Sequence, residues 1–524
     1  MFGPSRLALV LLGLLAFFNA VRHPFVHDDV VFILQNPHIN EVGAWAQAFE
    51  PPLAKGGLNT YYRPVLEVVY RLEYRLFGFR PAGFHLFNIL VHIANGLLLF
   101  SLLQKLALAR HAAWFISLIF LIHPVQTEAV SCIAGISNLW MALGLLLSLH
   151  AYLNKRHLAS LMFYAAAFLS KEQAVMIVPL VMVIDFSRGK PKNFRSWFYW
   201  ILATGALLAL RGSMTGSSLL GDILASPGEF ILRLAAIPRD IEMYLRLVFF
   251  PYDLHYYRST DILQSNVIAW ILAVVLAAGL IYLYQRAARL RGALILGLGW
   301  FLAALCPVLN IVPLINEYSF ILTSEHFLYL PLAGILIAAV SAVDLYAVHF
   351  KKALAGAVVA VCLLMTWYQN TFWAGEIVLF ERMLRYEPNF GRGHLLLAKA
   401  YYFSGKYPQA DAHFKRTFDI MSGYAAKAAN STAKKYYSSM IKEILFDWSQ
   451  NDSSMGRWGQ ALEKLKREEA MGGDAAMYNN MAFIYSHMGD SKQAYLSLQQ
   501  ALRADPSFIP ARRNMQAILT ASHL

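Results

Sequence analysis

The sequence predicts an all-α protein in which a polytopic membrane domain is followed by a superhelix of short helical repeats. Three observations indicate this. With 58% hydrophobic and 15% charged residues, the chain is too apolar for a soluble globular protein, in which about a quarter of residues are charged. Apolar runs long enough to cross a bilayer recur through the first 375 residues. From about residue 376 small and aromatic residues recur in a soluble helical pattern.

The basic residues indicate membrane topology rather than nucleic-acid binding. The formal net charge is +13, but the lysines and arginines fall in short clusters between apolar segments. No basic stripe with interleaved aromatic residues is present, so we expect no nucleic-acid partner. Cys132, Cys306 and Cys362 lie in or beside apolar segments, which argues against a disulfide framework or a thiolate metal site.

Apolar runs of about 17 to 25 residues predict about eleven transmembrane helices. We place them near residues 6–21, 84–104, 112–128, 131–152, 157–170, 174–186, 196–211, 267–284, 292–312, 325–346 and 353–371. The first run lacks a small-residue cleavage site, so we expect a retained anchor. The segment 231–250 is interrupted by a proline and several charges, which predicts an amphipathic helix in the membrane interface.

The charge distribution sets the expected orientation. With the N-terminus inside, every predicted inside loop is basic, whereas counting 231–250 as a span would break this pattern. The first outside loop is then 22–83, and the C-terminus lies outside. We therefore expect a transmembrane domain, 1–375, and an outside domain, 376–524.

The outside domain contains tetratricopeptide-like helical pairs. One set of spaced small and aromatic positions is Leu397, Ala398, Tyr401, Gly405, Tyr407, Ala410 and Phe414. The spacing returns in Met481, Ala482, Tyr485, Gly489, Ala494, Leu498 and Ala501. Residues 425–470, around Gly456, read as a degenerate unit, and the tail from Ile509 as a capping helix. Three units and a cap are close to the minimum for a stable stack.

The polar residues that could transfer a proton or bind a phosphate all fall on the predicted outside face. These candidates are His27, Asp28, Asp29, Arg63, His123, Glu128, Lys171, Glu172, Arg239, Arg258, Glu325 and His326. The predicted inside loops carry only basic clusters and linkers. This asymmetry favours a charged site at one membrane surface.

Structural interpretations compete with a functional one at each position. Asp28 and Asp29 could be solvated loop acids, Lys171 and Glu172 a local ion pair, and Arg63 a helix-start residue. His85 shares a helical face with Asn88, His92 and Asn95, a stripe that helix-helix hydrogen bonds explain adequately. No HExxH, P-loop or dinucleotide fingerprint is present, so neither a metal site nor a nucleotide site is indicated.

A carboxylate and several cations beside a membrane suit group transfer from a phosphate-bearing lipid. The cations can bind the leaving phosphate, and a carboxylate can take the proton of an attacking hydroxyl. One aspartate would be the general base and the other would orient it; the sequence leaves open which is which. An activated donor requires no cofactor, and a divalent cation is not indicated.

Six ordered motifs resemble the TMTC (transmembrane and tetratricopeptide-repeat) O-mannosyltransferases of the GT-C superfamily. They are His27-Asp28-Asp29, Tyr62-Arg63-Pro64, Phe84-His85-Leu86-Phe87-Asn88, His123-Pro124 with Thr127-Glu128-Ala129-Val130, Ser170-Lys171-Glu172-Gln173, and Glu325-His326-Phe327-Leu328-Tyr329-Leu330-Pro331. The resemblance covers nearly the whole chain and includes the repeats.

The resemblance implies a GT-C fold with a polyprenyl-phosphate sugar donor, mannose as the candidate sugar, and a protein hydroxyl as acceptor. By position it implies Asp28 as the base, Asp29 as its acidic neighbour, and donor-site roles for Lys171, Glu172 and Glu325. Arg63 and His326 are further candidates for the donor site, although His326 stands where the family commonly has arginine. The short repeat array suggests a bacterial relative in the inner membrane, with a cytoplasmic N-terminus and periplasmic repeats that bind the acceptor.

The alternative function is a non-enzymatic membrane anchor whose repeats assemble outside partners. A bare anchor needs one span rather than about eleven with polar groups gathered at one face, so the enzyme is favoured. A transporter would show repeated halves and charges near mid-membrane, and no inverted repeat is present.

Overall fold

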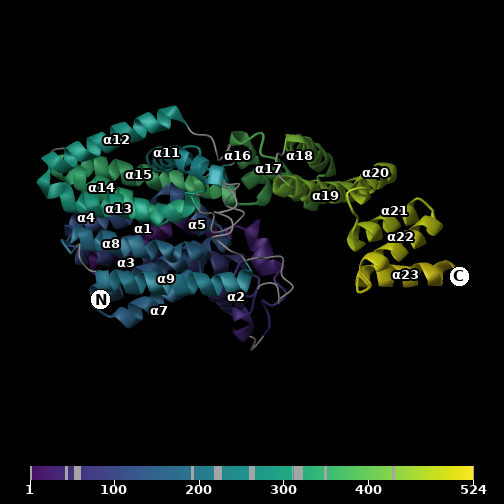
Figure 1. Cartoon of the computed structure of the whole chain (residues 1–524), viewed down its shortest axis with the longest axis horizontal. Helices are drawn as coiled ribbons and strands as arrows, with labels where there is room; N and C mark the ends of the chain where they lie inside the picture. The colour runs from purple at the N-terminus through teal and green to yellow at the C-terminus, as the bar shows by residue number, and fades with distance from the viewer. Residues whose placement is uncertain are drawn as a thin grey trace. The chain divides into compact units, whose positions relative to one another are not determined.

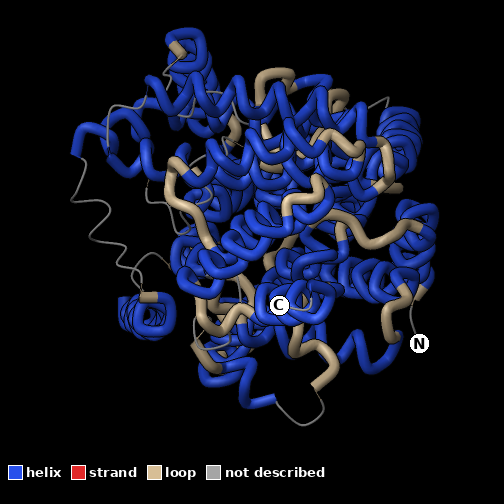
Figure 2. The backbone as a smooth tube through the Cα atoms, turned by 90° about the vertical axis from the view of Figure 1, so that its right-hand side faces the viewer, coloured by secondary structure: helices blue, strands red, loops and turns tan. Residues whose placement is uncertain are grey.

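The structure is a computed structural model. It describes the chain except residues 1–2, 42–44, 52–60, 191–193, 217–226, 259–265, 310, 312–322, 347–350, 428–430 and 523–524. Its described residues form helices joined by turns and loops, with one isolated antiparallel bridge between Arg258 and Thr323 (Figure 2). The chain divides into two compact units, Met1–Leu379 and Phe380–Leu524. The expected boundary at residues 375 and 376 stays a prediction.

The first unit is a bundle of helices of unequal length. Its members are α1 (Pro4–Phe17), α2 (Pro64–Phe77), α3 (Pro81–Lys105), α4 (Arg110–Ile122), α5 (Thr127–Ser131), α6 (Ile136–Leu153), α7 (His157–Phe168), α8 (Ile177–Ser187), α9 (Phe194–Thr215), α11 (Pro227–Phe249), α12 (Val267–Arg286), α13 (Arg291–Leu305), α14 (Pro331–Tyr346) and α15 (Lys351–Asn370). Helix α3 packs on α1, α4 and α6, and α13 packs on α8 and α14 (Figure 1). The core of the unit is one continuous apolar cluster drawn from most of these helices.

Six helical stretches in the described residues are long and apolar enough to cross a membrane, or seven if one bent pair is counted as a span. The expected number of eleven is therefore not confirmed. Several expected spans are short helices: α7 has 12 residues and α8 has 11. At 1.5 Å per residue such helices cover about 17 Å, which is less than the ~30 Å hydrocarbon core.

The expected span 112–128 is broken near its C-terminal end. Helix α4 stops at Ile122, and the chain bends by 51° before the short helices at Pro124–Ser131. Pro124 explains the break, because it forces the preceding His123 into an extended conformation, ψ 132°, and cannot donate a helical hydrogen bond. The carbonyl groups at the end of α4 that lose their helical donors find other partners: Phe120 O accepts from Gln126 Nε2, Leu121 O contacts His92 Nε2, and Ile122 O accepts from Thr366 Oγ1. This break puts Glu128 inside the bundle.

Helices α11 and α12 differ in their surroundings. Helix α11, the expected interfacial helix 231–250, contains Pro238 and is not among the candidate spans. Its depth in the membrane stays a prediction. Helix α12 is a candidate span of which only 6% is buried, so its apolar side chains are available to lipid.

The second unit is a succession of helices in which each packs on the next. Helix α16 (Glu376–Tyr386) crosses the boundary, and α17 (Gly391–Phe403), α18 (Tyr407–Lys427), α19 (Ser431–Ser454), α20 (Trp458–Glu469), α21 (Ala475–His487), α22 (Ser491–Ala504) and α23 (Ile509–Ser522) follow. Gly405, Gly456 and Gly489 each take a positive φ, 71° to 81°, in the turn inside a helical pair. Glycine adopts this left-handed conformation without strain, which explains its recurrence at the same place in each pair.

Candidate active site

The residues His27, Asp28 and Asp29 form a tight turn shortly after α1. His27 takes a positive φ of 50°, which is uncommon for a residue with a side chain. The turn is closed by hydrogen bonds from Asp29 N to Val26 O and from Val26 N to Asp29 Oδ2, each 3.0 Å. His27 N donates to Glu376 Oε1 at 3.0 Å. The backbone of the turn is therefore fixed both by hydrogen bonds within the turn and by the bond to Glu376.

Asp29 is buried and committed to this local structure. Its Oδ1 accepts a 2.7 Å hydrogen bond from Ala134 N, beyond α5, while Oδ2 accepts from Val26 N. Burial raises the pKa of Asp29 to about 7, although the two backbone N–H groups act in the opposite direction. Asp29 thus ties the turn to the segment before α6.

Asp28 is the accessible member of the pair. Its side chain is 39% exposed and lies 3.4 Å from His27 Nε2. The hydroxyl of Tyr256 donates a long hydrogen bond of 3.5 Å to Asp28 Oδ2. Tyr256 is buried and packs edge-on against the His27 ring and Trp373. Asp28 therefore keeps acceptor capacity for an incoming group.

Arg63 and Glu172 form a bidentate ion pair that links the segment before α2 to the turn between α7 and α8. Arg63 Nε and Nη2 donate to the two Glu172 oxygens at 3.1 and 2.9 Å. Burial of Glu172 opposes ionisation, but the Arg63 guanidinium outweighs it and lowers the pKa of Glu172 to about 2. Arg63 also stands immediately before α2, so its helix-start role is met as well.

Lys171 is a buried cation beside this pair. Its Nζ donates to Asn138 Oδ1 at 2.7 Å and lies 5.9 Å from the centre of the Phe327 ring. Burial and the nearby Arg63 lower the pKa of Lys171 to about 7, while Glu172, Glu128 and Asp28 partly oppose that shift. Lys171 therefore lies within electrostatic range of Asp28. The partners of Lys171 and Glu172 are Asn138 and Arg63, not simply each other.

Glu128, on α5, holds the segment before α14. Ser324 Oγ donates to both of its oxygens, and His326 N donates to Oε2 at 2.9 Å. His326 Nδ1 lies 2.7 Å from Glu128 Oε1. These contacts occupy His326, a residue that the sequence placed among the candidates for the donor site.

Glu325 pairs with Arg258 in the interior. Both terminal nitrogens of Arg258 lie 3.2 Å from Glu325 Oε1, and His255 N donates to the same oxygen at 2.6 Å. The two side chains are 2% and 1% exposed. Removing either partner would leave the other charge buried and unpaired, so the contacts between Arg258 and Glu325 constrain the loop that carries Tyr256.

The remaining candidates have structural partners. His85 contacts the carbonyl oxygen of His23, and His123 contacts that of Val248 while accepting from Val125 N as a helix cap. His92 and Asn95 on α3 contact Leu121 O on α4 and Leu139 O on α6, as expected for helix-helix hydrogen bonding, and both also bond the Tyr329 hydroxyl. Arg239 lies on α11 within electrostatic range of Asp240.

The sequence did not single out several residues that the structure adds. Tyr256, Asn138, Ser324 and Glu376 contact Asp28, Lys171, Glu128 and the His27 backbone respectively. Tyr256 and Ser324 carried a signal in the sequence, since they stand in the same short clusters as the candidates Arg258 and Glu325. Within the described residues no group of three or more His, Cys, Asp or Glu side chains could hold a metal ion.

Comparisons with known proteins agree with this organisation. A tetratricopeptide-repeat family profile matches residues 475–508, the pair α21 and α22. A protein O-mannosyl-transferase of Caenorhabditis elegans is 24% identical over 446 residues, which cover 80% of this chain and 63% of that protein. The protein O-mannosyl-transferase TMTC4 of Mus musculus is 31% identical over 215 residues, 34% of this chain and 29% of that protein.

A human relative matches a similar length of chain. The protein O-mannosyl-transferase TMTC2 of Homo sapiens is 30% identical over 233 residues, 40% of this chain and 28% of that protein. Among solved structures, one described as the crystal structure of the APC/C hetero-tetramer Cut9-Hcn1 aligns with a TM-score of 0.24 and 13% identity, over 78% of this chain and 83% of that one. That score is too low to indicate a shared fold. The resemblance to the TMTC O-mannosyltransferases is confirmed, and the matched segments span less than two thirds of each relative.

Proposed function

We propose that this chain, a relative of the TMTC O-mannosyltransferases, is an integral-membrane glycosyltransferase that moves a sugar from a polyprenyl-phosphate carrier to a protein Ser or Thr hydroxyl. The observation that carries the proposal is that Asp28 and Asp29 differ in burial and in their hydrogen-bond partners. Asp29 is buried and accepts two backbone hydrogen bonds, whereas Asp28 is 39% exposed and lies within electrostatic range of the buried cation Lys171. An accessible carboxylate near a buried cation suits proton transfer at a site that also binds phosphate.

In the proposed reaction Asp28 is the general base. It takes the proton of the acceptor hydroxyl as the hydroxyl oxygen forms a bond to the anomeric carbon of the sugar. The bond between that carbon and the phosphate oxygen breaks, and the electron pair leaves with the polyprenyl phosphate. Tyr256, which donates to Asp28, and the strained His27 backbone fix the direction of the carboxylate. A single displacement of this kind inverts the anomeric configuration.

Lys171 and Arg63 are the proposed phosphate-binding groups. Lys171 Nζ has three donor positions, and Asn138 accepts from one of them. Because its pKa is near 7, an approaching phosphate favours the charged ammonium and is bound more tightly by it. Both oxygens of Glu172 accept from Arg63 and fix the position of its guanidinium group. The positive charge of Arg63 is therefore held at a defined place. Glu325 and Glu128 act by positioning the loops.

The repeat unit is proposed to bind the acceptor protein. Tetratricopeptide repeats expose a surface built from successive helices, which suits an extended peptide. The proposed location is a bacterial inner membrane, with the N-terminus cytoplasmic and the repeats periplasmic. The positive-inside pattern supports this orientation.

The function is tested by glycoproteomics of outside-facing proteins. A strain without the gene is complemented with the wild-type chain, with Asp28→Asn, or with Glu41→Gln. Glu41 is a matched control, because it is an acid of the same outside loop and its side chain is also 39% exposed. We expect hexose-modified Ser or Thr sites to return with the wild type and Glu41→Gln and to stay absent with Asp28→Asn. Identical glycopeptides with and without the gene would refute the transferase proposal and favour the non-enzymatic scaffold.

A further inference from the structure

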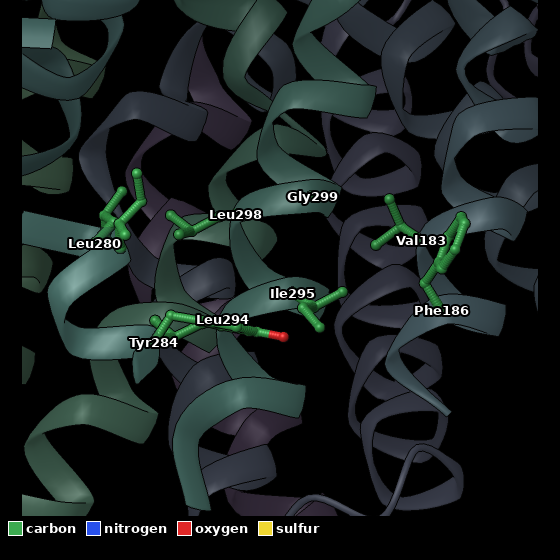
Figure 3. A pocket seen from close by; sticks show the side chains of 9 residues that line it. Val183, Phe186, Leu280, Tyr284, Leu294, Ile295, Leu298 and Gly299 are labelled. Atoms are coloured by element: carbon green, nitrogen blue, oxygen red, sulfur yellow. The ribbon is translucent and has the colours of Figure 1, made fainter. Parts of the chain in front are cut away.

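An apolar groove of about 490 Å³ lies between α8, α12 and α13, and none of the residues that line it belongs to the candidate active site (Figure 3). Val183 and Phe186 lie on one side and Leu280 on the other, with Ile295 and Leu298 of α13 between them. The remaining lining residues are also hydrophobic or glycine, apart from the hydroxyl group of one tyrosine. A groove of this size and character suits a hydrocarbon chain.

The groove opens toward the part of the bundle that faces lipid. On α12, Ala269 is the buried residue of the helix, and side chains such as Leu276 and Ile281 are at least half exposed. An apolar helix with exposed large side chains on most of its surface is stable only in a hydrocarbon environment. A lipid chain can therefore enter the groove from the bilayer.

One end of the groove is rimmed by arginines at the ends of the three helices that form it. Arg291 lies three and four residues before Leu294 and Ile295, so it shares their face of α13. Its Nε donates to Tyr284 O at 2.8 Å, which fixes the guanidinium beside the groove. Arg286 ends α12, and Arg188 directly follows α8.

A second pocket of about 390 Å³ at the same helix ends combines leucine and alanine side chains with arginine and serine side chains. Its lining includes Arg188, Arg289, Ser187 and Ser341, and no carboxylate lines it. Within the described part of the chain, the side chains of Arg188 and Arg289 have no hydrogen-bond or ion-pair partner. Two exposed guanidinium groups in a concave site without an acid favour a phosphate group.

We propose that the groove and this arginine rim bind an anionic phospholipid. One acyl chain lies in the groove against Phe186 and Ile295, and the phosphate lies at the rim beside Arg188 and Arg291. The rim belongs to the loops that the positive-inside rule places in the cytoplasm, where anionic lipids attract basic groups at the membrane surface. This site does not depend on the transferase proposal, because it shares no residue with it.

The proposal is tested by native mass spectrometry of the full chain in detergent, titrated with phosphatidylglycerol or with phosphatidylcholine of the same chains. We expect phosphatidylglycerol to bind more tightly. Arg188→Gln is the main variant because its guanidinium holds no other described element, and it should weaken phosphatidylglycerol binding by about fivefold, the equivalent of ~1 kcal/mol per basic residue near the headgroups. Phosphatidylcholine binding should not change. Arg156→Gln, at an exposed arginine between α6 and α7, is the matched control and should bind like the wild type.

The groove itself is tested by filling it with a larger side chain. Leu298→Trp and Ile295→Phe occlude it from two positions, so that one variant suffices if the other fails to fold. Either should reduce phosphatidylglycerol binding. Equal binding of the two lipids, equal losses in Arg188→Gln and Arg156→Gln, or full binding in a correctly folded groove variant would overturn the proposal. Displacement by inorganic phosphate alone, or preferential binding of polyprenyl phosphate, would assign the site to another occupant and also overturn it.

Discussion

Exchanging each aspartate of the pair for its amide separates their two roles. In Asp29→Asn the side chain keeps one carbonyl oxygen and turns an NH₂ group toward the other backbone N–H. In the wild type, Asp29 accepts hydrogen bonds from Ala134 N at 2.7 Å and from Val26 N at 3.0 Å. In Asp29→Asn one of these two buried N–H groups therefore loses its acceptor. Such a loss costs about 1–3 kcal/mol of folding free energy. We expect a melting temperature lowered by a few degrees and residual transfer by the folded fraction.

Asp28→Asn should have the opposite profile. The carboxylate is 39% exposed, and its contacts with His27 and Tyr256 are 3.4 and 3.5 Å long. A change at such a site alters the free energy of unfolding by about 0.5 kcal/mol or less. Loss of a general base lowers the transfer rate by about 10²–10⁴-fold. We therefore expect a wild-type melting temperature and almost no turnover.

The assay compares thermal unfolding and sugar transfer for both variants in one detergent, with Glu41→Gln as the matched control. The reasoning holds only if Asp29→Asn mainly lowers the melting temperature and Asp28→Asn mainly lowers the rate of sugar transfer. An Asp29→Asn protein that melts like the wild type but is inactive, beside an active Asp28→Asn protein, would reverse the assignment.

Three further outcomes are expected. The folded pKa of Lys171 is about 7, below its ordinary 10.5, so the folded state binds fewer protons between these values and its stability rises with pH across that window. Donor affinity should fall as pH rises through about 7, and Lys171→Arg should abolish that pH dependence in titrations with labelled donor. Arg63→Lys cannot reproduce the two bonds to Glu172; we expect donor KM to rise about tenfold or more, and an unchanged KM would remove Arg63 from phosphate binding. Deleting residues 391–524 should retain donor binding and lower transfer to the native acceptor while short peptides still react; the deletion must keep Glu376, which accepts from His27 N.

The sequence was most informative where contacts are local. The spacing around Gly405 and Gly489 predicted helical pairs, and a repeat family profile matches the second of them. The polar stripe of His92 and Asn95 forms helix-helix hydrogen bonds, as the structural interpretation expected. A recurring period or a helical face is a property of neighbouring residues, so one sequence contains it.

The sequence was least informative where partners are far apart. Lys171 and Glu172 suggested a local ion pair, yet Glu172 binds Arg63, 109 residues away, and Lys171 binds Asn138. The two aspartates could not be told apart, because burial of Asp29 depends on Ala134 in another segment. Apolar runs predicted about eleven spans, whereas six helical stretches of the described residues, or seven with one bent pair, are long and apolar enough to cross a membrane. Hydropathy does not show where a helix such as α4 ends.

The most direct test of the central claim is transfer of a labelled sugar from synthetic polyprenyl-phosphate mannose to an acceptor protein by the purified chain in lipid nanodiscs. The account predicts transfer with inverted anomeric configuration by the wild type and Glu41→Gln, and donor binding without transfer by Asp28→Asn. Transfer by Asp28→Asn at the wild-type rate would contradict it.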